Sequence, residues 1–187
     1  MVERTDLLVV GGGVFGLGTA WEAAKRGRTV RLIDRSVFPT PDGASIGPSR
    51  KLRSTYPNPG YTRLVLEAIP AWRELEQAIG EPILLSLGNV AYSVSDDHPT
   101  LDAFVAAGEA AGSRIQRLGR EELRRRFPTF RLARSATFEP DAGMLRATVG
   151  TGAIRSQAIA AGVDVLEGVG VTALDLEGPT PAAILAD

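Results

Sequence analysis

The chain has 187 residues, of which 44% are hydrophobic and 23% charged, and its 21 basic and 22 acidic side chains give a formal net charge of −1. This length and composition are typical of a globular protein with one sizeable domain, and the balanced charge argues against binding nucleic acid or an anionic membrane through the overall field. No cysteine is present, which excludes disulfides, thiolate metal sites and a cysteine nucleophile within these residues.

The N-terminal stretch Met1–Asp6 lacks a basic region followed by a long apolar segment. The first apolar run, Leu7–Val10, leads directly into glycines. Such a run is too short for the core of a signal peptide or for a membrane span. We therefore expect a cytoplasmic protein.

The first elements form a strand, a helix and a second strand. Leu7–Val10 is a continuous apolar run, as expected of a parallel strand buried on both faces. From Phe15 to Arg26 the apolar residues follow a helical period, and Gly27 ends the helix. Thr29–Ile33 is the second strand, which ends at Asp34. Strand, helix and strand together have the length of a βαβ unit.

The loop after the first strand carries the pattern G-x-G-x-x-G at Gly11, Gly13 and Gly16. The first glycine permits a tight turn, the second lets the backbone approach a pyrophosphate, and the third lets the helix lie close to the sheet. The N-terminus of the helix, at Val14 and Phe15, offers N–H groups to phosphate oxygens. We therefore expect all five residues to contact a dinucleotide.

Asp34 follows Gly16 by 18 residues, where a carboxylate accepts hydrogen bonds from ribose hydroxyls. The alternative is a simple glycine turn with a solvated carboxylate, which is less favoured because context and spacing agree independently. Arg35 is a further candidate cofactor contact that would attract a 2′-phosphate, but the neighbouring carboxylate would repel one. NADP is therefore the least favoured dinucleotide, and the motif does not separate NAD from FAD.

The segment Ser36–Pro59 is rich in Pro, Gly and Ser and is long for a connection inside a compact domain, which indicates function or disorder. Small residues at Ser45 and Ser49 would allow a ligand to approach closely, and Arg50 and Arg53 would offer forked donors to phosphate or carboxylate. A solvated basic turn is the alternative, and residue types alone leave both open.

A helix is predicted over Tyr61–Ile79, with a kink or a break into two helices at Pro70. The elements expected after it are strands at Ile83–Leu85 and Val90–Val94, a helix at Leu101–Ala111, a strand at Arg114–Leu118, a charged helix at Arg120–Phe127, strands at Ala136–Glu139 and Met144–Leu145, a weak helix at Thr148–Ala161, and strands at Val163–Leu166, Val169–Leu176 and Ala182–Leu185. Val163–Leu166 is apolar enough to return to the parallel sheet. Because no closing element follows the last strand, we expect the domain to be incomplete.

Three segments of the chain, in order, resemble the FAD-dependent amine oxidases of the monomeric sarcosine oxidase and pipecolate oxidase group, in the D-amino-acid oxidase superfamily. They are the glycine loop, the stretch from Gly43 to Arg53 and the stretch from Ala136 to Leu145. The group shows a segment like G-S-S-H-G-x-S-R-x-x-R, which stands here as Gly43-Ala44-Ser45-Ile46-Gly47-Pro48-Ser49-Arg50-Lys51-Leu52-Arg53. The usual histidine is Ile46 in this chain, so a polar role for that position is in doubt.

The resemblance implies FAD as the cofactor and an amino acid as the substrate. By it, Arg53 would bind the substrate carboxylate, Arg50 would lie near the flavin ring and also contact the cofactor, and Tyr56 would border the substrate cavity. Ser45 and Ser49 would contact FAD. The fold implied is α/β, with a Rossmann-like FAD-binding βαβ unit and an interleaved antiparallel substrate region, truncated at the C-terminus.

The expected domains are FAD-binding residues 1–80, a partial substrate region at 81–145, and a return to the FAD-binding domain at 146–187. The expected reaction is oxidation of an amino acid's C–N bond, with O2 as the electron acceptor, to an imine and hydrogen peroxide. Members of the group are roughly twice as long as this chain, so a missing C-terminal half or a partner subunit is expected. Two alternatives are an NAD-dependent dehydrogenase and a non-catalytic dinucleotide-binding fragment.

Two other features are set aside. His98, the sole histidine, follows Asp96 and Asp97 at the start of a predicted helix, where helix capping is more plausible than a metal site. Glu139 and Asp141 suggest paired carboxylates for acid–base chemistry, but a Pro-Asp-Ala-Gly turn explains them better.

Overall fold

A computed structural model describes residues 4–39, 43–177 and 180–186. Part of the predicted long connection, residues 40–42, therefore lies outside the described residues. The chain divides into two compact units. The first unit comprises Met1–Pro48 and Ala147–Asp187, and the second comprises Ser49–Arg146.

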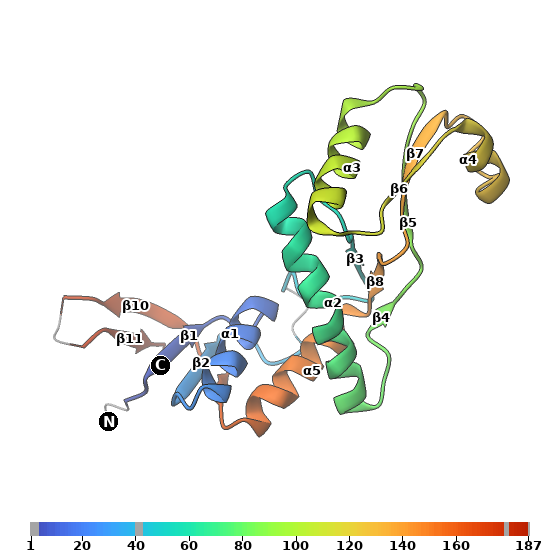
Figure 1. The fold of residues 1–187 in the computed structure, drawn as a ribbon. Coiled ribbons are helices and arrows are strands. Elements are labelled where there is room, and N and C mark those ends of the chain that lie inside the picture. The colour runs from blue at the N-terminus through green and yellow to red at the C-terminus, as the bar shows by residue number, and fades with distance from the viewer. Residues whose placement is uncertain (1–3, 40–42, 178–179, 187) are drawn as a thin grey trace. The chain divides into compact units, whose positions relative to one another are not determined.

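The first unit contains the predicted βαβ arrangement. Strand β1 (Leu7–Val10), helix α1 (Val14–Lys25) and strand β2 (Val30–Asp34) follow one another, and β1 pairs with β2 in parallel. The chain returns after the second unit as β9 (Asp164–Glu167), which pairs in parallel with the other edge of β2. The resulting sheet has the order β1-β2-β9 (Figure 1). The predicted Rossmann-like unit, and the predicted return of the chain to its sheet, are confirmed.

Helix α5 (Ala147–Ala160) lies alongside α1 in the first unit (Figure 1). The buried positions of α5 include Gly150, Ala153 and Ala158, so its contact face carries little side-chain volume. Small residues on one helix let a neighbouring helix approach closely. Gly150, which weakens the helical pattern in the sequence, is therefore one of the small buried residues that allow this close packing.

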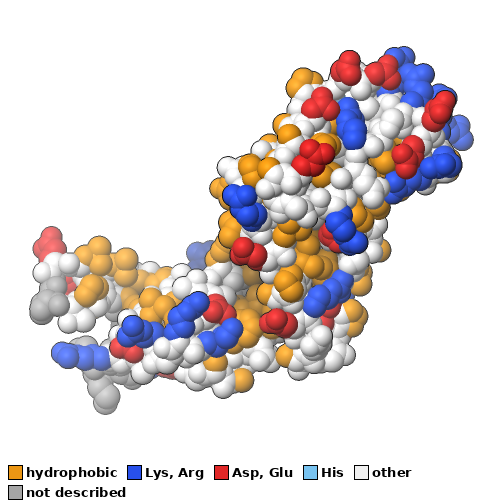
Figure 2. Space-filling view, in the orientation of Figure 1, with side chains coloured by type: hydrophobic (Ala, Val, Ile, Leu, Met, Phe, Trp, Pro, Cys, Tyr) orange, Lys and Arg blue, Asp and Glu red, His pale blue; other side chains and the backbone are white. Residues whose placement is uncertain are grey.

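The first unit ends in an antiparallel hairpin of β10 (Val171–Asp175) and β11 (Ala182–Leu185). Several of its apolar side chains are exposed, with Leu174 at 58% and Leu176, directly after β10, at 69%. Figure 2 shows hydrophobic side chains on the surface of this hairpin.

The second unit holds two antiparallel sheets and three helices. The first sheet has the order β3-β8-β4, with β3 at Arg50–Leu52, β8 at Gly143–Leu145 and β4 at Leu84–Leu85. The second sheet has the order β5-β7-β6, with β5 at Asn89–Ser93, β7 at Ser135–Glu139 and β6 at Gln116–Leu118. The helices are α2 (Pro59–Ile79), α3 (Pro99–Ala111) and α4 (Arg120–Arg126). The predicted antiparallel character of this region is confirmed.

Helix α2 has a capping residue at each end. The Asn58 side chain accepts a hydrogen bond from the N–H of Gly60, and Gly80 closes the helix in the left-handed conformation with φ of 69°. Pro70 lies inside a single continuous helix, so the predicted break into two helices is wrong. Proline removes one backbone hydrogen bond, and the remaining turns of this 21-residue helix continue past that point.

Glu76 ties α2 to the strand that follows it. Its Oε1 accepts hydrogen bonds from the N–H groups of Ile83 and Leu84, both at 2.7 Å, and its carboxylate also pairs with Arg73. Burial alone would raise the pKa of Glu76, but the hydrogen bonds from Arg73 and the two backbone N–H groups outweigh it and lower that pKa. The carboxylate therefore holds β4 against α2 in its charged form.

Basic side chains gather over α4 (Figure 2). Several of them are paired, since Arg126 contacts Glu122, and Arg134 contacts Asp96 at 3.1 Å. Such pairs are typical of a solvated surface helix. Within the described residues, no helix combines the length and the apolar character needed to cross a membrane.

Candidate functional site

The glycine loop has the geometry that its sequence predicts. Gly11 has φ of 106°, a conformation that favours glycine, and its N–H donates to the carbonyl of Ile33 at 2.8 Å. A side chain at Gly16 would collide with the carbonyl oxygen of Gly11. The loop therefore turns tightly out of β1 and lies directly against the first turn of α1.

Asp34, the last residue of β2, is tied to this loop. Its Oδ2 accepts a hydrogen bond from the N–H of Gly12, and its Oδ1 accepts one from the N–H of Ser36 at 2.7 Å. A carboxylate has about four acceptor positions, so these two bonds leave capacity for donors from a ligand. The carboxylate is thereby fixed at the carboxyl end of the parallel sheet, where α/β folds bind ligands.

Ser45 lies at the N-terminus of α1. Its Oγ accepts a hydrogen bond from the N–H of Val14 at 3.0 Å. The start of α5 holds this loop in place, because Thr151 donates to the Ser45 carbonyl at 3.1 Å and the backbone N–H of Thr148 donates to the Gly47 carbonyl at 3.1 Å. The loop at 43–47 is therefore an ordered wall beside the glycine loop, supported by α5.

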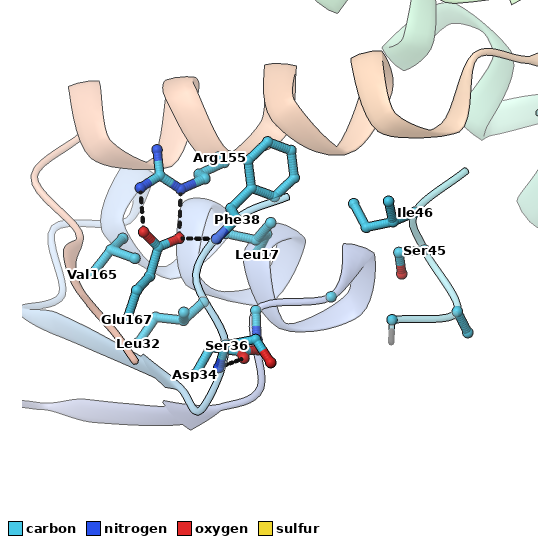
Figure 3. A pocket seen from close by; sticks show the side chains of 14 residues that line it. Leu17, Leu32, Asp34, Ser36, Phe38, Ser45, Ile46, Arg155, Val165 and Glu167 are labelled. Atoms are coloured by element: carbon cyan, nitrogen blue, oxygen red, sulfur yellow. Dashed lines mark hydrogen bonds and ion pairs between the residues drawn. The ribbon is translucent and has the colours of Figure 1, made fainter. Parts of the chain in front are cut away.

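These segments enclose a cavity of about 80 Å³ (Figure 3), several times the space that one water molecule needs. It lies entirely within the first unit. Its lining residues are Gly12, Gly13, Leu17, Leu32, Asp34, Ser36, Phe38, Gly43, Ala44, Ser45, Ile46, Arg155, Val165 and Glu167. The lining combines apolar side chains with a few fixed polar groups, as ligand sites commonly do.

An ion pair closes one side of the cavity (Figure 3). Arg155 of α5 binds Glu167 at the end of β9 through two hydrogen bonds, both at 2.9 Å. Glu167 also accepts a hydrogen bond from the backbone N–H of Phe38 at 3.3 Å, and the Arg155 guanidinium lies 5.7 Å from the centre of the Phe38 ring. This pair therefore holds the Phe38 ring at the cavity wall.

The structure brings together part of the predicted cofactor set. Gly13, Asp34 and Ser45 line the cavity, Val14 is bonded to Ser45, and Gly11 and Gly16 shape the loop beneath. Phe15 and Arg35, two further predicted contacts, do not line the cavity. Both are exposed, the Phe15 side chain to 90%.

The other predicted residues, Ser49, Arg50, Arg53 and Tyr56, belong to the second unit. Arg50 lies on β3, is exposed and donates to the Ser49 carbonyl at 2.8 Å. Arg53 is exposed, and among the residues that the structure describes its guanidinium has no hydrogen-bond or ion-pair partner. Tyr56 is half-buried, and its ring centroid lies 6.3 Å from that of Tyr61.

Sequence reasoning missed several cavity residues. Ser36 and Phe38 lie in the long connection after β2. Arg155 and Glu167 follow Phe38 by more than 100 residues in the sequence. One signal was available for Glu167. It directly follows the predicted strand Val163–Leu166, and the carboxyl ends of parallel strands share one edge of a sheet, where ligands bind.

The site fits a dinucleotide. The loop contains two positions where only glycine avoids strain or collision, at Gly11 and Gly16, and such positions let backbone N–H groups approach a phosphate. The Asp34 carboxylate at the neighbouring strand end is suited to ribose hydroxyls. The adjacent cavity has apolar walls suited to a base.

Comparisons with known proteins point the same way. Residues 6–184 match the family described as FAD dependent oxidoreductase. The chain is 31% identical over 134 residues to a peroxisomal sarcosine oxidase of Mus musculus, covering 69% of this chain and 33% of that protein. It is 27% identical over 174 residues to an N-methyl-L-tryptophan oxidase of Yersinia pestis (strain Pestoides F), covering 91% and 46%.

Solved structures give the same picture. One is the Tyr258Phe mutant of NikD, described as an unusual amino acid oxidase essential for nikkomycin biosynthesis. This chain is 28% identical to it, with a TM-score of 0.78, and the match covers 98% of this chain and 48% of that one. The L-proline dehydrogenase from P. horikoshii, at 21% identity and a TM-score of 0.82, shares the fold. The chain spans about a third to a half of the length of these relatives.

Proposed function

This chain belongs to the family of FAD-dependent oxidoreductases, and we propose that it forms the N-terminal, FAD-holding portion of an enzyme that oxidises the C–N bond of an amino acid. The predicted cofactor, FAD, is confirmed by the family. The observation that carries the proposal is the first-unit cavity, where the glycine loop, the Asp34 carboxylate and the Ser45 wall converge.

The first unit, in this proposal, holds the adenosine diphosphate portion of FAD. The N–H groups at Gly13 and Val14 and the N-terminal dipole of α1 would stabilise the phosphates. Backbone donors occupy two acceptor positions of Asp34 and hold its carboxylate in place. The remaining positions would accept hydrogen bonds from ribose hydroxyls. Gly11, Phe15, Gly16 and Arg35 would contribute through their backbone or at the cavity mouth.

The second unit, residues 49–146, would supply the substrate contacts. Arg53 would bind the substrate carboxylate, and its exposed guanidinium, unpaired within the described residues, supports this role. Arg50 would place a positive charge near the flavin ring, Ser49 would contact the cofactor, and Tyr56 would border the substrate. The domains proposed from the sequence, 1–80, 81–145 and 146–187, remain a proposal about which part binds which ligand.

FAD, when bound, supplies the acceptor for the hydride equivalent that leaves the carbon next to nitrogen, and O2 then takes up the electrons as hydrogen peroxide. The contribution of this chain is to bind and orient. A carboxylate anchored by Arg53 restricts the substrate to one orientation, which lowers the entropic part of the barrier. The imine that results is hydrolysed in water.

Sarcosine and N-methyl-L-tryptophan are the substrates to try first, because two of the matched relatives are named as oxidases of these compounds. We further propose a cytoplasmic enzyme whose remaining half, from the same polypeptide or a partner subunit, completes the active site.

The test is to purify the gene product containing these residues, record its visible absorption spectrum and assay peroxide formation with these two substrates. Flavin absorption and peroxide release with at least one of them are expected. An Arg53→Met variant should retain the flavin spectrum and show a raised KM. A protein that binds NAD and reduces it, without flavin, would instead support the dehydrogenase alternative.

A further inference from the structure

Glu139 is a buried acidic residue that the proposed reaction does not use. It ends β7, and only 2% of its surface is exposed. Its Oε2 accepts hydrogen bonds from the N–H of Ser54 at 2.8 Å, the N–H of Thr55 at 2.9 Å and the hydroxyl of Ser54 at 3.2 Å. Its Oε1 accepts one from the Asn89 side-chain amide at 2.6 Å.

Hydrogen-bond donors, and no cation among the described residues, surround the carboxylate. A buried charge is costly unless it is paired or fully hydrogen-bonded, and four donors surround this one. Within the described residues, Glu139 has no basic ion-pair partner. Arg53 is next to Ser54 in the sequence, but its guanidinium does not pair with Glu139. The guanidinium is therefore available to bind another anion.

The segment that Glu139 binds is also fixed from α2 and α3. Ser54 and Thr55 are fully buried, and the Thr55 hydroxyl lies 2.9 Å from that of Ser113, just beyond α3. The buried hydroxyl of Thr62, on α2, accepts from the N–H of Tyr56 at 3.0 Å and donates to its carbonyl at 3.1 Å. The backbone from 54 to 56 is thus clamped.

The residues on either side of the buried pair are the two proposed substrate contacts. Arg53 is exposed and Tyr56 is half-buried. Their backbone positions are fixed by the clamp, while their side chains remain available. A site gains affinity when its groups are ordered before the ligand arrives, because less entropy is lost on binding.

We propose that Glu139 is a positioning residue, which fixes the 54–55 backbone from 85 residues away in sequence and so sets Arg53 and Tyr56 for a substrate carboxylate. The inference rests on the proposed function for the role of Arg53, but not for the clamp itself.

The first measurement needs no cofactor or substrate. Amide hydrogen exchange of Ser54 and Thr55 is followed by NMR in the wild-type chain and in Glu139→Leu, which removes the acceptor and keeps the bulk. Exchange at both amides should accelerate about tenfold or more, as expected when hydrogen bonds to a charged acceptor are lost. The matched control is Asp141→Asn, in the same turn, whose partner Arg114 lies elsewhere.

A conservative variant keeps the test informative if Glu139→Leu does not fold. In Glu139→Gln the side-chain carbonyl can keep the Ser54 and Thr55 bonds, and the Asn89 amide can rotate to accept from the new NH2 group. Exchange in this variant should stay within about threefold of wild type, because the same number of hydrogen bonds is retained. Unchanged exchange rates of the Ser54 and Thr55 amides in Glu139→Leu would refute the proposal that Glu139 fixes this backbone.

The second measurement uses the FAD-loaded gene product and sarcosine as the probe. Glu139→Leu should raise KM about tenfold or more while the flavin spectrum stays unchanged, and Glu139→Gln should rescue KM. In Arg53→Met, adding Glu139→Leu should raise KM by a smaller factor than it does in the wild type, since the contact through Arg53 is already lost. Additive effects would overturn the positioning role. An unchanged KM in Arg53→Met alone would refute the proposed role of Arg53, whatever the exchange data show.

Discussion

Asp34 has two roles at one strand end in the proposed function, since it fixes the turn at Gly12 and Ser36 and lines the cavity proposed for the nucleotide. Replacing it with alanine removes the acceptor for both backbone donors and for ribose hydroxyls. We predict that Asp34→Ala weakens FAD binding about tenfold or more, since each hydrogen bond to a carboxylate is worth about 1.5–3 kcal/mol. Titration of the purified chain with FAD, followed by flavin fluorescence, measures the dissociation constant.

The control for this experiment is Arg35→Ala, which alters the adjacent exposed residue outside the cavity lining. Its effect on the dissociation constant should be smaller than that of Asp34→Ala. Equal affinities for wild type and Asp34→Ala would contradict the assignment of this carboxylate to the ribose.

Single residues were predictable where local geometry dictates them. Gly11 and Gly16 follow from the tight turn, and Asp34 follows from its place at a strand end. Phe38, Arg155 and Glu167 were not predictable in the same way, because they meet only after β9 joins the sheet. The sequence explains Glu139 only as part of a turn. Its hydrogen bonds to Ser54 and Thr55 could not be predicted, because they form only when segments 84 and 85 residues apart meet in the fold.

The junction of α2 and β4 depends on the charged form of Glu76, whose pKa is lowered in the fold despite its burial. A carboxyl with a depressed pKa stabilises the fold at pH values above its unfolded pKa, about 4.3, and loses that contribution as pH falls through the folded pKa. We predict that the free energy of unfolding declines below about pH 4 partly through this group.

Glu76→Gln tests this expectation by urea unfolding between neutral and acidic pH. The variant should be less stable at neutral pH, where two backbone donors lose a charged acceptor. It should also lose less stability on acidification than the wild type does. Parallel pH profiles for the two proteins would show that another carboxyl dominates.

Most elements, short strands such as β4 and β8 included, were predicted to within a few residues, and β3 was the exception. The amphipathic pattern located α2 and α3 to within a few residues, while β3 lay unseen in the long connection. Its three residues form a strand only because β8 pairs with them, about 90 residues later in the sequence. Pro70 predicts a possible break in α2, but the residues on either side of it keep the helix continuous.

The cavity proposed for the nucleotide lies wholly in the first unit, which predicts different affinities for the two halves of FAD. We predict that the 187-residue chain binds ADP measurably and FMN at least about tenfold more weakly, because FMN lacks the ribose and base that Asp34 and the cavity would hold. Isothermal titration calorimetry with each nucleotide measures both. Equal affinity for FMN would place the recognition elsewhere in the molecule.

The family of the whole molecule was predictable because three separated segments agreed in order, and no single motif separated FAD from NAD. The fold class followed from the βαβ unit and the apolar return strand. The compact units did not follow from the sequence, because their boundaries depend on which strands pair across the long connection.

The pairing of β9 with β2 makes the completion of the first unit depend on a late part of the chain. Arg31 and Asp164, on these two strands, are hydrogen-bonded across 133 residues of sequence. During synthesis, β1, α1 and β2 emerge from the ribosome first, but the strand and helix that complete the cavity emerge only after the whole second unit. Contacts of such long sequence separation form late. The nascent chain therefore gains the cavity proposed for the cofactor only after the inserted unit has been translated, and FAD bound there would stabilise the first unit from that moment onward.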